Sequence, residues 1–241
     1  MKKSPGIMLK GQHRIGHRVL FNTDLHIPGA QWTCLLGRSG VGKSTILRLI
    51  LGLETGGVFS GSFAATDGAP FAGRISYMAQ SDLLLPWLSV LDNVIIGARL
   101  RGEAPNVDRA RDLLHRVGLS DYADQKPATL SGGMRQRAAL ARTLFEDRPI
   151  VFLDEPFSAL DAGTRADMQE LATDVLHDRT VLLITHDPAE AARLAHQIIV
   201  MSAQETQNWP VPETAALRDI NAAETLACQA QLLAYLRRSA A

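Results

Sequence analysis

Runs of apolar residues along the chain predict two kinds of strand. Uninterrupted apolar runs are typical of strands buried on both faces, and they cover 150–153, 181–184 and 198–201. Residues 32–36 are mostly apolar, with Thr33 as the polar exception, and are also predicted to form a buried strand. Alternating apolar and polar residues are typical of half-exposed strands, and they cover 25–27 and 74–78. Residues 56–73 hold five glycines and no helical period, which indicates hairpins or loops.

Apolar residues at helical spacing predict helices in other segments. These lie at 46–51, from Ser89 to Ala98, and at 108–117, 131–145, 161–176, 188–195 and 222–238. Because no strand interrupts the second, third and fourth of them, residues 82–145 are predicted to be a helical insertion in an α/β core. Residues 204–212 are polar with two prolines, and this pattern favours a linker before the tail helix.

Composition excludes some classes of protein. The chain has 241 residues, of which 46% are apolar and 21% charged, as expected for a globular protein. Its 25 basic and 25 acidic residues balance, which argues against binding nucleic acid by bulk charge. Cys34 and Cys228 lie far apart and are expected to be free thiols of a reducing cytoplasm. No apolar run approaches the roughly 18 residues of a membrane span or forms a signal-peptide core, so we expect a cytosolic chain.

A glycine-rich segment between a predicted strand and a predicted helix fits the phosphate-binding pattern G-x-x-x-x-G-K-[ST]. Its glycines let backbone N–H groups turn toward one anion, and the helix N-terminus adds its positive dipole end. Lys43 is expected to reach the β- and γ-phosphates of a nucleotide, and Ser44 to bind Mg²⁺. The alternative is a turn that binds nothing. The segment comprises Gly37, Arg38, Ser39, Gly40, Val41, Gly42, Lys43, Ser44 and Thr45.

Three more predicted strands end in polar groups suited to nucleotide chemistry. They lead to Gln80, to the pair Asp154 and Glu155, and to His186. Open α/β sheets bind ligands at the carboxyl ends of their strands, so these groups are expected to converge. Asp154 is the predicted Mg²⁺-organising acid, Glu155 the predicted base for an attacking water, and His186 a predicted γ-phosphate contact. An acidic pair that only caps the next helix is the alternative.

A second anion cradle is predicted at Leu130–Arg137, where Ser131, Gly132 and Gly133 open a helix. Because one chain already has a phosphate loop, a second cradle suggests that two chains share the nucleotide. With Gln136, this segment reads LSGG-x-x-Q, and the whole set of motifs resembles the ATP-binding subunit of ATP-binding-cassette (ABC) transporters over roughly residues 8–202.

The resemblance assigns expected roles to residues by their matching positions. Gly37–Thr45 is similar to the Walker A loop and Ile150–Glu155 to the Walker B strand, with Glu155 as the catalytic base. Gln80 resembles the Q-loop glutamine that contacts Mg²⁺ and the attacking water, and His186 the switch histidine. Ser131, Gly132, Gly133 and Gln136 resemble the signature that covers ATP on the partner subunit, and Ser158–Asp161 the D-loop, so that Asp161 also lies by the nucleotide.

The family resemblance also implies a fold and partners. It implies one ABC ATPase domain over 1–241, with a P-loop NTPase (RecA-like) core and antiparallel β subdomain at 1–81 and 146–203, a helical subdomain at 82–145, and a linker and tail helix at 204–241. ATP and Mg²⁺ are the implied cofactors. A second copy, an integral membrane permease and, indirectly, a periplasmic or lipid-anchored solute-binding protein are the implied partners, at the cytoplasmic face of the inner membrane. No nucleic acid is expected.

A narrower resemblance rests on the apolar segment Leu83–Trp87, the following Val90–Val94 and Met134. These are similar to the nitrate, sulfonate and taurine importers, a branch that also includes transporters of thiamine precursors. Leu83–Trp87 is therefore expected to contact the permease, with simple packing on the next helix as the alternative. A non-transport ABC ATPase acting on a macromolecular complex is the other hypothesis, although the short segment between Lys43 and Ser131 leaves no room for a long coiled coil.

One family feature is missing. Related chains place an aromatic residue upstream of the phosphate loop to stack on adenine, but residues 1–20 contain no Phe, Tyr or Trp. His13 and Ile15 occupy this neighbourhood, and either is expected to give at most a partial platform. The predicted consequence is a loosely held adenine.

Overall fold

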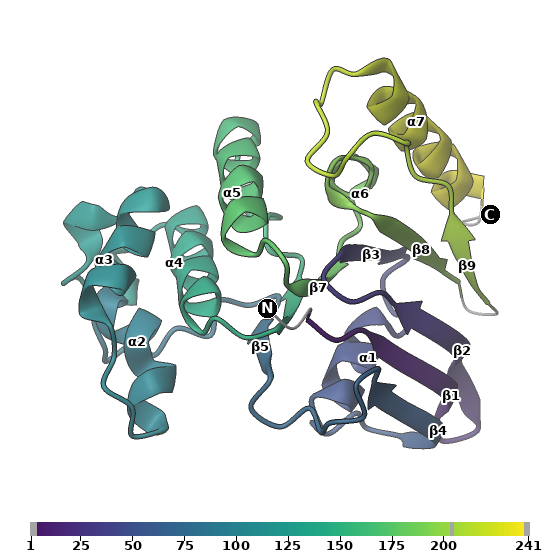
Figure 1. Cartoon of the computed structure of the whole chain (residues 1–241), viewed down its shortest axis with the longest axis horizontal. Helices are drawn as coiled ribbons and strands as arrows, with labels where there is room; N and C mark the ends of the chain where they lie inside the picture. The colour runs from purple at the N-terminus through teal and green to yellow at the C-terminus, as the bar shows by residue number, and fades with distance from the viewer. Residues whose placement is uncertain (1–3, 203–204, 239–241) are drawn as a thin grey trace. The chain divides into compact units, whose positions relative to one another are not determined.

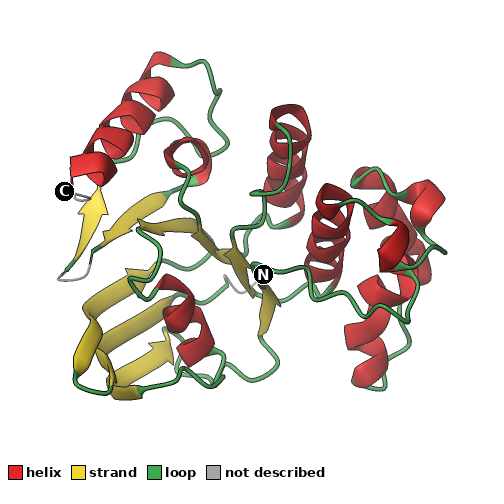
Figure 2. Cartoon of the chain, turned by 180° about the vertical axis from the view of Figure 1, so that it is seen from behind, coloured by secondary structure: helices red, strands yellow, loops and turns green. Residues whose placement is uncertain are grey.

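The computed structural model describes residues 4–202 and 205–238. Within these residues the chain forms two sheets and several helices (Figures 1 and 2). The strands are β1 (Ile7–Ile15), β2 (Arg18–Ile27), β3 (Trp32–Gly37), β4 (Val58–Ala65), β5 (Ile75–Met78), β6 (Ile150–Asp154), β7 (Thr180–Ile184), β8 (Gln197–Met201) and β9 (Thr206–Trp209).

The predicted helices are confirmed, with ends that shift by a few residues. They are α1 (Lys43–Ile50), α2 (Val90–Leu100), α3 (Val107–Arg116), α4 (Gly132–Phe145), α5 (Ala162–Val175), α6 (Pro188–Leu194) and α7 (Ala223–Arg238). Short 3₁₀ turns, η1 (Ser120–Tyr122) and η2 (Pro127–Thr129), separate α3 from α4. In the part of the chain that the structure describes, no helix is long and apolar enough to cross a lipid bilayer.

The sheets differ in strand direction. A three-stranded sheet has the order β2-β1-β4, and both pairs are antiparallel. A six-stranded sheet has the order β5-β6-β7-β3-β8-β9. Here β3 runs parallel to β7 and to β8, and β9 is an antiparallel edge strand. The strand β4 lies within 56–73, where hairpins or loops were predicted. The interpretation of 204–212 as a linker was wrong, because β9 lies there; Gln204 itself is outside the described residues.

The chain divides into two compact units. The first unit comprises residues 1–75, 149–152 and 178–241, and the second comprises 76–148 and 153–177. These limits are not those of the predicted subdomains, since residues 153–177, which include the end of β6 and all of α5, belong to the second unit together with the predicted helical insertion. The subdomain borders given above stay predictions.

The first unit has its core in the central strands. Every residue of β3 and β7 is buried, as the uninterrupted apolar runs predicted. Cys34 lies at the centre of β3, and burial raises the pKa of its thiol far above the usual range. Such a thiol stays protonated and is chemically inert.

The tail helix is fastened to the first unit through one buried arginine. Arg218 is only 5% exposed, and α7 packs on α6. The guanidinium of Arg218 donates hydrogen bonds to the carbonyl oxygens of Ala192 (3.0 Å), Ala195 (2.8 Å) and Pro212 (2.9 Å). It therefore satisfies carbonyls at the end of α6, where helices have no internal donors left.

A histidine in the same region makes stability depend on pH. Nδ1 of His196 accepts a hydrogen bond from the backbone N–H of Trp32 at 3.1 Å, so this nitrogen carries no proton. His196 is exposed overall, but the desolvation of its ring by neighbouring atoms and, to a smaller extent, the charge of Arg218 lower its pKa. The pKa of His196 in the folded protein lies below its unfolded value of about 6.5. The contribution of His196 to the free energy of unfolding is therefore complete above that pH and is lost as the pH falls below it.

We therefore expect the free energy of unfolding to decrease between about pH 7.5 and pH 5.5. Urea titrations at both pH values measure it. The variant His196→Gln should weaken the dependence, whereas His17→Gln, at an exposed turn, should leave it unchanged. Equal pH dependence in wild type and His196→Gln would contradict the assignment.

The second unit is built around α4. Both α2 and α3 pack on α4, and α5 contacts it as well (Figure 1). Side chains cap the helix starts: Ser89 accepts from the N–H of Asp92, and Asn106 from that of Arg109.

Candidate functional site

The phosphate loop joins β3 to α1 in the first unit. Gly37 ends β3 and could not be another residue, because an added Cβ would lie 2.3 Å from the carbonyl oxygen of Met201. Gly42 caps α1 with a φ of 106°, a left-handed conformation that favours glycine. Between them, Arg38, Ser39 and Gly40 are exposed. The loop therefore presents its backbone at the N-terminus of a helix, as an anion site requires.

Lys43 points into this loop. It is 7% exposed, and its ammonium donates to the carbonyl oxygens of Gly37 (2.6 Å) and Arg38 (2.9 Å). Ser44 and Thr45 follow in the first turn of α1 and are half-buried. The positive charge is thus fixed beside the backbone of the predicted phosphate loop.

His186 belongs to the same unit and the same sheet edge. It follows β7, and β7 pairs in parallel with β3 through Leu35 and Ile184. The side chain of His186 is exposed. Just before it, the hydroxyl of Thr185 donates to Glu190 Oε2 (2.6 Å) and accepts from the N–H of Asp187, which fixes the backbone of the loop.

The second unit contains the predicted base. Asp154 ends β6 and is 3% exposed, whereas Glu155, the next residue, is half-buried. The amide of Gln80 donates to Glu155 Oε2 at 3.1 Å. Glu155 adopts a φ of 51°, an uncommon conformation for a residue with a side chain. A donated amide hydrogen and a kinked backbone thus orient this carboxylate.

The predicted signature opens α4 in the same unit. Ser131 caps the helix and accepts from the N–H of Met134 at 3.2 Å, and Gly132 and Gly133 form the first turn. Ser131 and Gly132 are exposed, so the helix N-terminus faces outward. Asp161 likewise caps α5 by accepting from Thr164, and this bond holds the pKa of its carboxyl below the ordinary value.

Gln136 has a role that its position in the motif did not reveal. Its Nε2 donates to the carbonyl oxygen of Glu155 at 3.0 Å, and its Oε1 accepts from the N–H of Ala159 at 2.8 Å. Gln136 is 7% exposed. One side-chain amide therefore bridges the signature helix to the backbone of the predicted base.

The sequence-predicted residues thus form two groups, one in each unit. The phosphate loop and His186 lie in the first unit, and the remaining predicted residues lie in the second. Those of the second unit are Gln80, Ser131, Gly132, Gly133, Gln136, Asp154, Glu155 and Asp161.

Comparison with known proteins identifies the family. A model of the ABC transporter family matches residues 20–158, more than half of the chain. The chain belongs to the ABC transporter family. An uncharacterized ABC transporter ATP-binding protein of Haemophilus influenzae is 41% identical over 228 residues, which cover 92% of this chain and 93% of that protein. An aliphatic sulfonates import ATP-binding protein, SsuB 2 of Agrobacterium fabrum, is 46% identical over 79% of this chain and 73% of its own length.

Solved structures give the same assignment. The dimeric structure of MJ0796, a bacterial ABC transporter cassette, is 28% identical with a TM-score of 0.72, over 88% of this chain and 99% of that one. A second MJ0796 structure, in a post-hydrolysis state bound to ADP and Pi, has the same scores. These matches confirm the ABC family, the α/β P-loop NTPase fold and the ATPase class predicted from the sequence.

In this ABC ATPase the apolar segment Leu83–Trp87 is only partly exposed. Trp87 is 66% exposed and Leu83 is 61% exposed, whereas Leu84 is buried. The segment is held by polar bonds: Arg142 donates to the carbonyl oxygens of Asp82 and Leu83, and the side chain of Asn93 bonds the backbone of Leu85. The backbone is therefore fixed while two large apolar side chains face outward.

His13 cannot provide a platform for adenine. Its side chain is 0% exposed, its Nε2 shares a hydrogen bond with Thr55 at 2.8 Å, and its ring stacks on Phe21 at 5.4 Å. The expectation that named His13 was therefore wrong, because β1 turns this residue toward the core. Ile15 is 45% exposed but offers no ring.

Proposed function

We propose that this chain is the ATP-hydrolysing subunit of a membrane importer for a small solute, working as a head-to-tail dimer with the permease at the cytoplasmic face of the inner membrane. The observation that carries the hydrolytic part is the hydrogen bond from Gln80 to Glu155. A base needs a fixed direction as well as basicity, and this bond supplies it.

The residues described above would have separate roles in ATP hydrolysis. Backbone amides of the phosphate loop and the ammonium of Lys43 would balance the charge of the β- and γ-phosphates. The Glu155 carboxylate would take one proton from the attacking water while the water oxygen bonds to the γ-phosphorus and ADP leaves. His186 would contact the γ-phosphate from the end of β7.

The donor set fits Mg²⁺ carried by the nucleotide. Among the described residues, no cluster of three His, Cys, Asp or Glu side chains could hold a metal ion. Mg²⁺ at phosphate sites is usually held by one or two carboxylates together with phosphate oxygens. Asp154, the Ser44 hydroxyl and the Gln80 amide oxygen would supply the protein ligands. Bound there, Mg²⁺ neutralises charge on the phosphates.

A dimer explains the second anion cradle. Ser131 and Gly132 are exposed at a helix N-terminus, where an anion is favoured. A head-to-tail arrangement would bring this N-terminus to the ATP on the partner's phosphate loop. The dimeric state of the related MJ0796 cassette supports this proposal.

Relatives named as aliphatic sulfonate import proteins support a solute of that type. The test is reconstitution of the chain with the permease and solute-binding protein encoded beside it. ATP hydrolysis should rise when the binding protein carries an aliphatic sulfonate, and stay at its basal rate with a carboxylate analogue of equal length. Equal rates with both would contradict the substrate class.

The exposed pair Trp87 and Leu83 is proposed to receive the permease, since large exposed aromatic residues are frequent contact points. Trp87→Ala should weaken co-purification with the permease by about tenfold or more, as loss of a contact worth about 2 kcal/mol would. ATP affinity of the isolated subunit should not change. Leu100→Ala, at an 80% exposed apolar residue of the same unit, is the matched control. Unchanged assembly of the Trp87 variant would mean that the segment only packs.

A further inference from the structure

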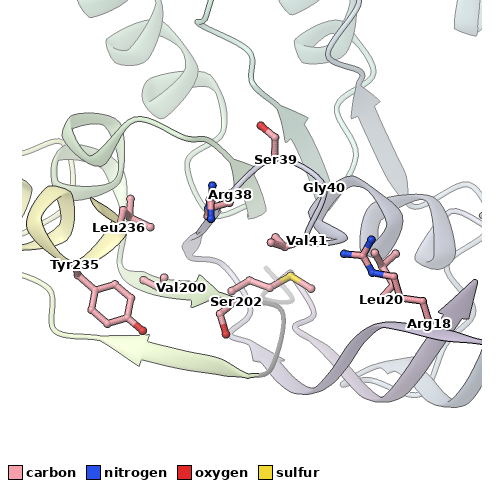
Figure 3. Close-up of a pocket in the computed structure, with 11 residues that line it drawn as sticks. Arg18, Leu20, Arg38, Ser39, Gly40, Val41, Val200, Ser202, Tyr235 and Leu236 are labelled. Carbon is pink, nitrogen blue, oxygen red and sulfur yellow. The ribbon is translucent and has the colours of Figure 1, made fainter. Parts of the chain in front are cut away.

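A pocket of about 260 Å³ lies directly beside the phosphate loop in the first unit (Figure 3). Its walls come from the start of β2, the exposed part of the phosphate loop, the end of β8 and the last turn of α7. Three planar side chains line the pocket: Arg18 and Tyr235 at its two ends, and Arg38 of the phosphate loop between them.

The course of β2 places one end of the pocket next to the start of α1. Phosphates held at the N-terminus of α1 lie by Gly42, and an added Cβ there would lie 3.1 Å from Cγ of Leu20. The strand β2 therefore passes the start of α1. Arg18 lies two residues before Leu20, on the same face of the strand, and both residues line the pocket.

The other ring systems are less suited to the base. His13 is buried against Phe21, as described above. Tyr235 lies at the far end of the pocket, where its ring packs on Trp209 with centroids 5.0 Å apart. Arg18 is exposed at the start of β2. A guanidinium is planar and weakly hydrated, and it stacks on nucleic-acid bases as aromatic rings do.

We propose that Arg18 stacks on the base of the nucleotide bound by the phosphate loop, in a chain whose residues 1–20 contain no aromatic ring for this purpose. This inference rests on the proposed nucleotide site and adds the residue that holds its base. Arg18 is then a binding residue for the adenine end, separate from the groups that hold phosphate.

The test distinguishes binding of the base from binding of the phosphates. Affinities for Mg-ATP and for Mg-tripolyphosphate, which has no base, are measured by calorimetry on wild type, Arg18→Ala, Arg18→Lys and Arg18→Tyr. Arg18→Ala should weaken ATP binding about tenfold, the size expected for a lost stacking contact. Tripolyphosphate binding should change less than about twofold in this variant, so the base-free ligand controls for general damage to the loop.

The other substitutions separate the plane of the side chain from its charge. Arg18→Lys keeps the charge without the plane and should lose ATP affinity as Arg18→Ala does. Arg18→Tyr should restore it. Arg14→Ala is the matched control, because Arg14 is also exposed near the same hairpin turn but does not line the pocket.

Three outcomes would overturn the inference. Full ATP affinity in Arg18→Lys would mean that only charge matters, and equal losses for ATP and tripolyphosphate would mean that Arg18 contacts phosphate. A loss of ATP affinity in Tyr235→Ala, with none in Arg18→Ala, would mean that the base contacts the tail helix instead. Absence of ATP binding in the wild type would instead contradict the proposed function, and this inference with it.

Discussion

Replacing Glu155 by Gln should reduce ATP turnover by about 10²- to 10⁴-fold, the usual contribution of a general base. The amide has the same shape and keeps the neighbour Gln80, but it cannot take the proton of the attacking water. Because Gln adopts the left-handed conformation of this position no less readily than Glu, the fold should not change. Phosphate release under saturating ATP measures the effect.

The same variant should still bind ATP, since the phosphate loop is untouched. ATP would then persist between two subunits, so gel filtration with ATP should show a dimer in Glu155→Gln that wild type forms only transiently. Glu213→Gln, an exposed residue outside the site, serves as the control. Turnover of Glu155→Gln near the wild-type rate would remove Glu155 from the role of base.

Replacing Arg218 by Ala should have the largest effect on stability. Three carbonyl oxygens that receive hydrogen bonds from a charged donor would lose it inside the protein, at a cost of about 3–5 kcal/mol in total. For a chain of this size we expect the midpoint of thermal unfolding to fall by about 10 °C or more. Circular dichroism during heating measures the midpoint.

Two further variants test the cause of this loss. Arg218→Lys should recover only part of the stability, because one ammonium cannot reach carbonyls on both sides as the guanidinium fork does. Arg238→Ala, an exposed arginine of the tail helix, should shift the midpoint by less than about 2 °C. An unchanged midpoint in Arg218→Ala would show that water replaces the guanidinium without cost.

Sequence reasoning succeeded where burial and local chemistry act together. The central strands are buried on both faces and read as continuous apolar runs, and the helix starts carry capping side chains such as Ser89 and Ser131. The phosphate loop could be predicted because the local backbone requires its glycines. Gly37, for instance, lies against the backbone of Met201.

The errors arose where distant segments define the structure. Gly61 looked like part of a loop, but it pairs with Gly11 across two strands whose backbones approach so closely that an added Cβ would lie 2.7 Å or less from the other strand. The edge strand β9 is mostly polar, so its backbone pairing with β8 has no counterpart in an apolar sequence pattern. In the sequence, Arg218 could not be told from a surface arginine, because no neighbouring residue indicates the three carbonyl oxygens to which it donates hydrogen bonds.

The bridge made by Gln136 has a consequence for signalling between subunits. In the dimer that we propose, the start of α4 serves the partner's nucleotide, while Glu155 serves the chain's own. One buried amide joins these two parts, with bonds of 3.0 Å to Glu155 and 2.8 Å to Ala159. A displacement of α4 when the partner releases its nucleotide would therefore pull on the backbone that aims the base. The orientation of the base in each subunit would therefore depend on whether nucleotide is bound at the partner's phosphate loop, and the two hydrolysis events would not be independent.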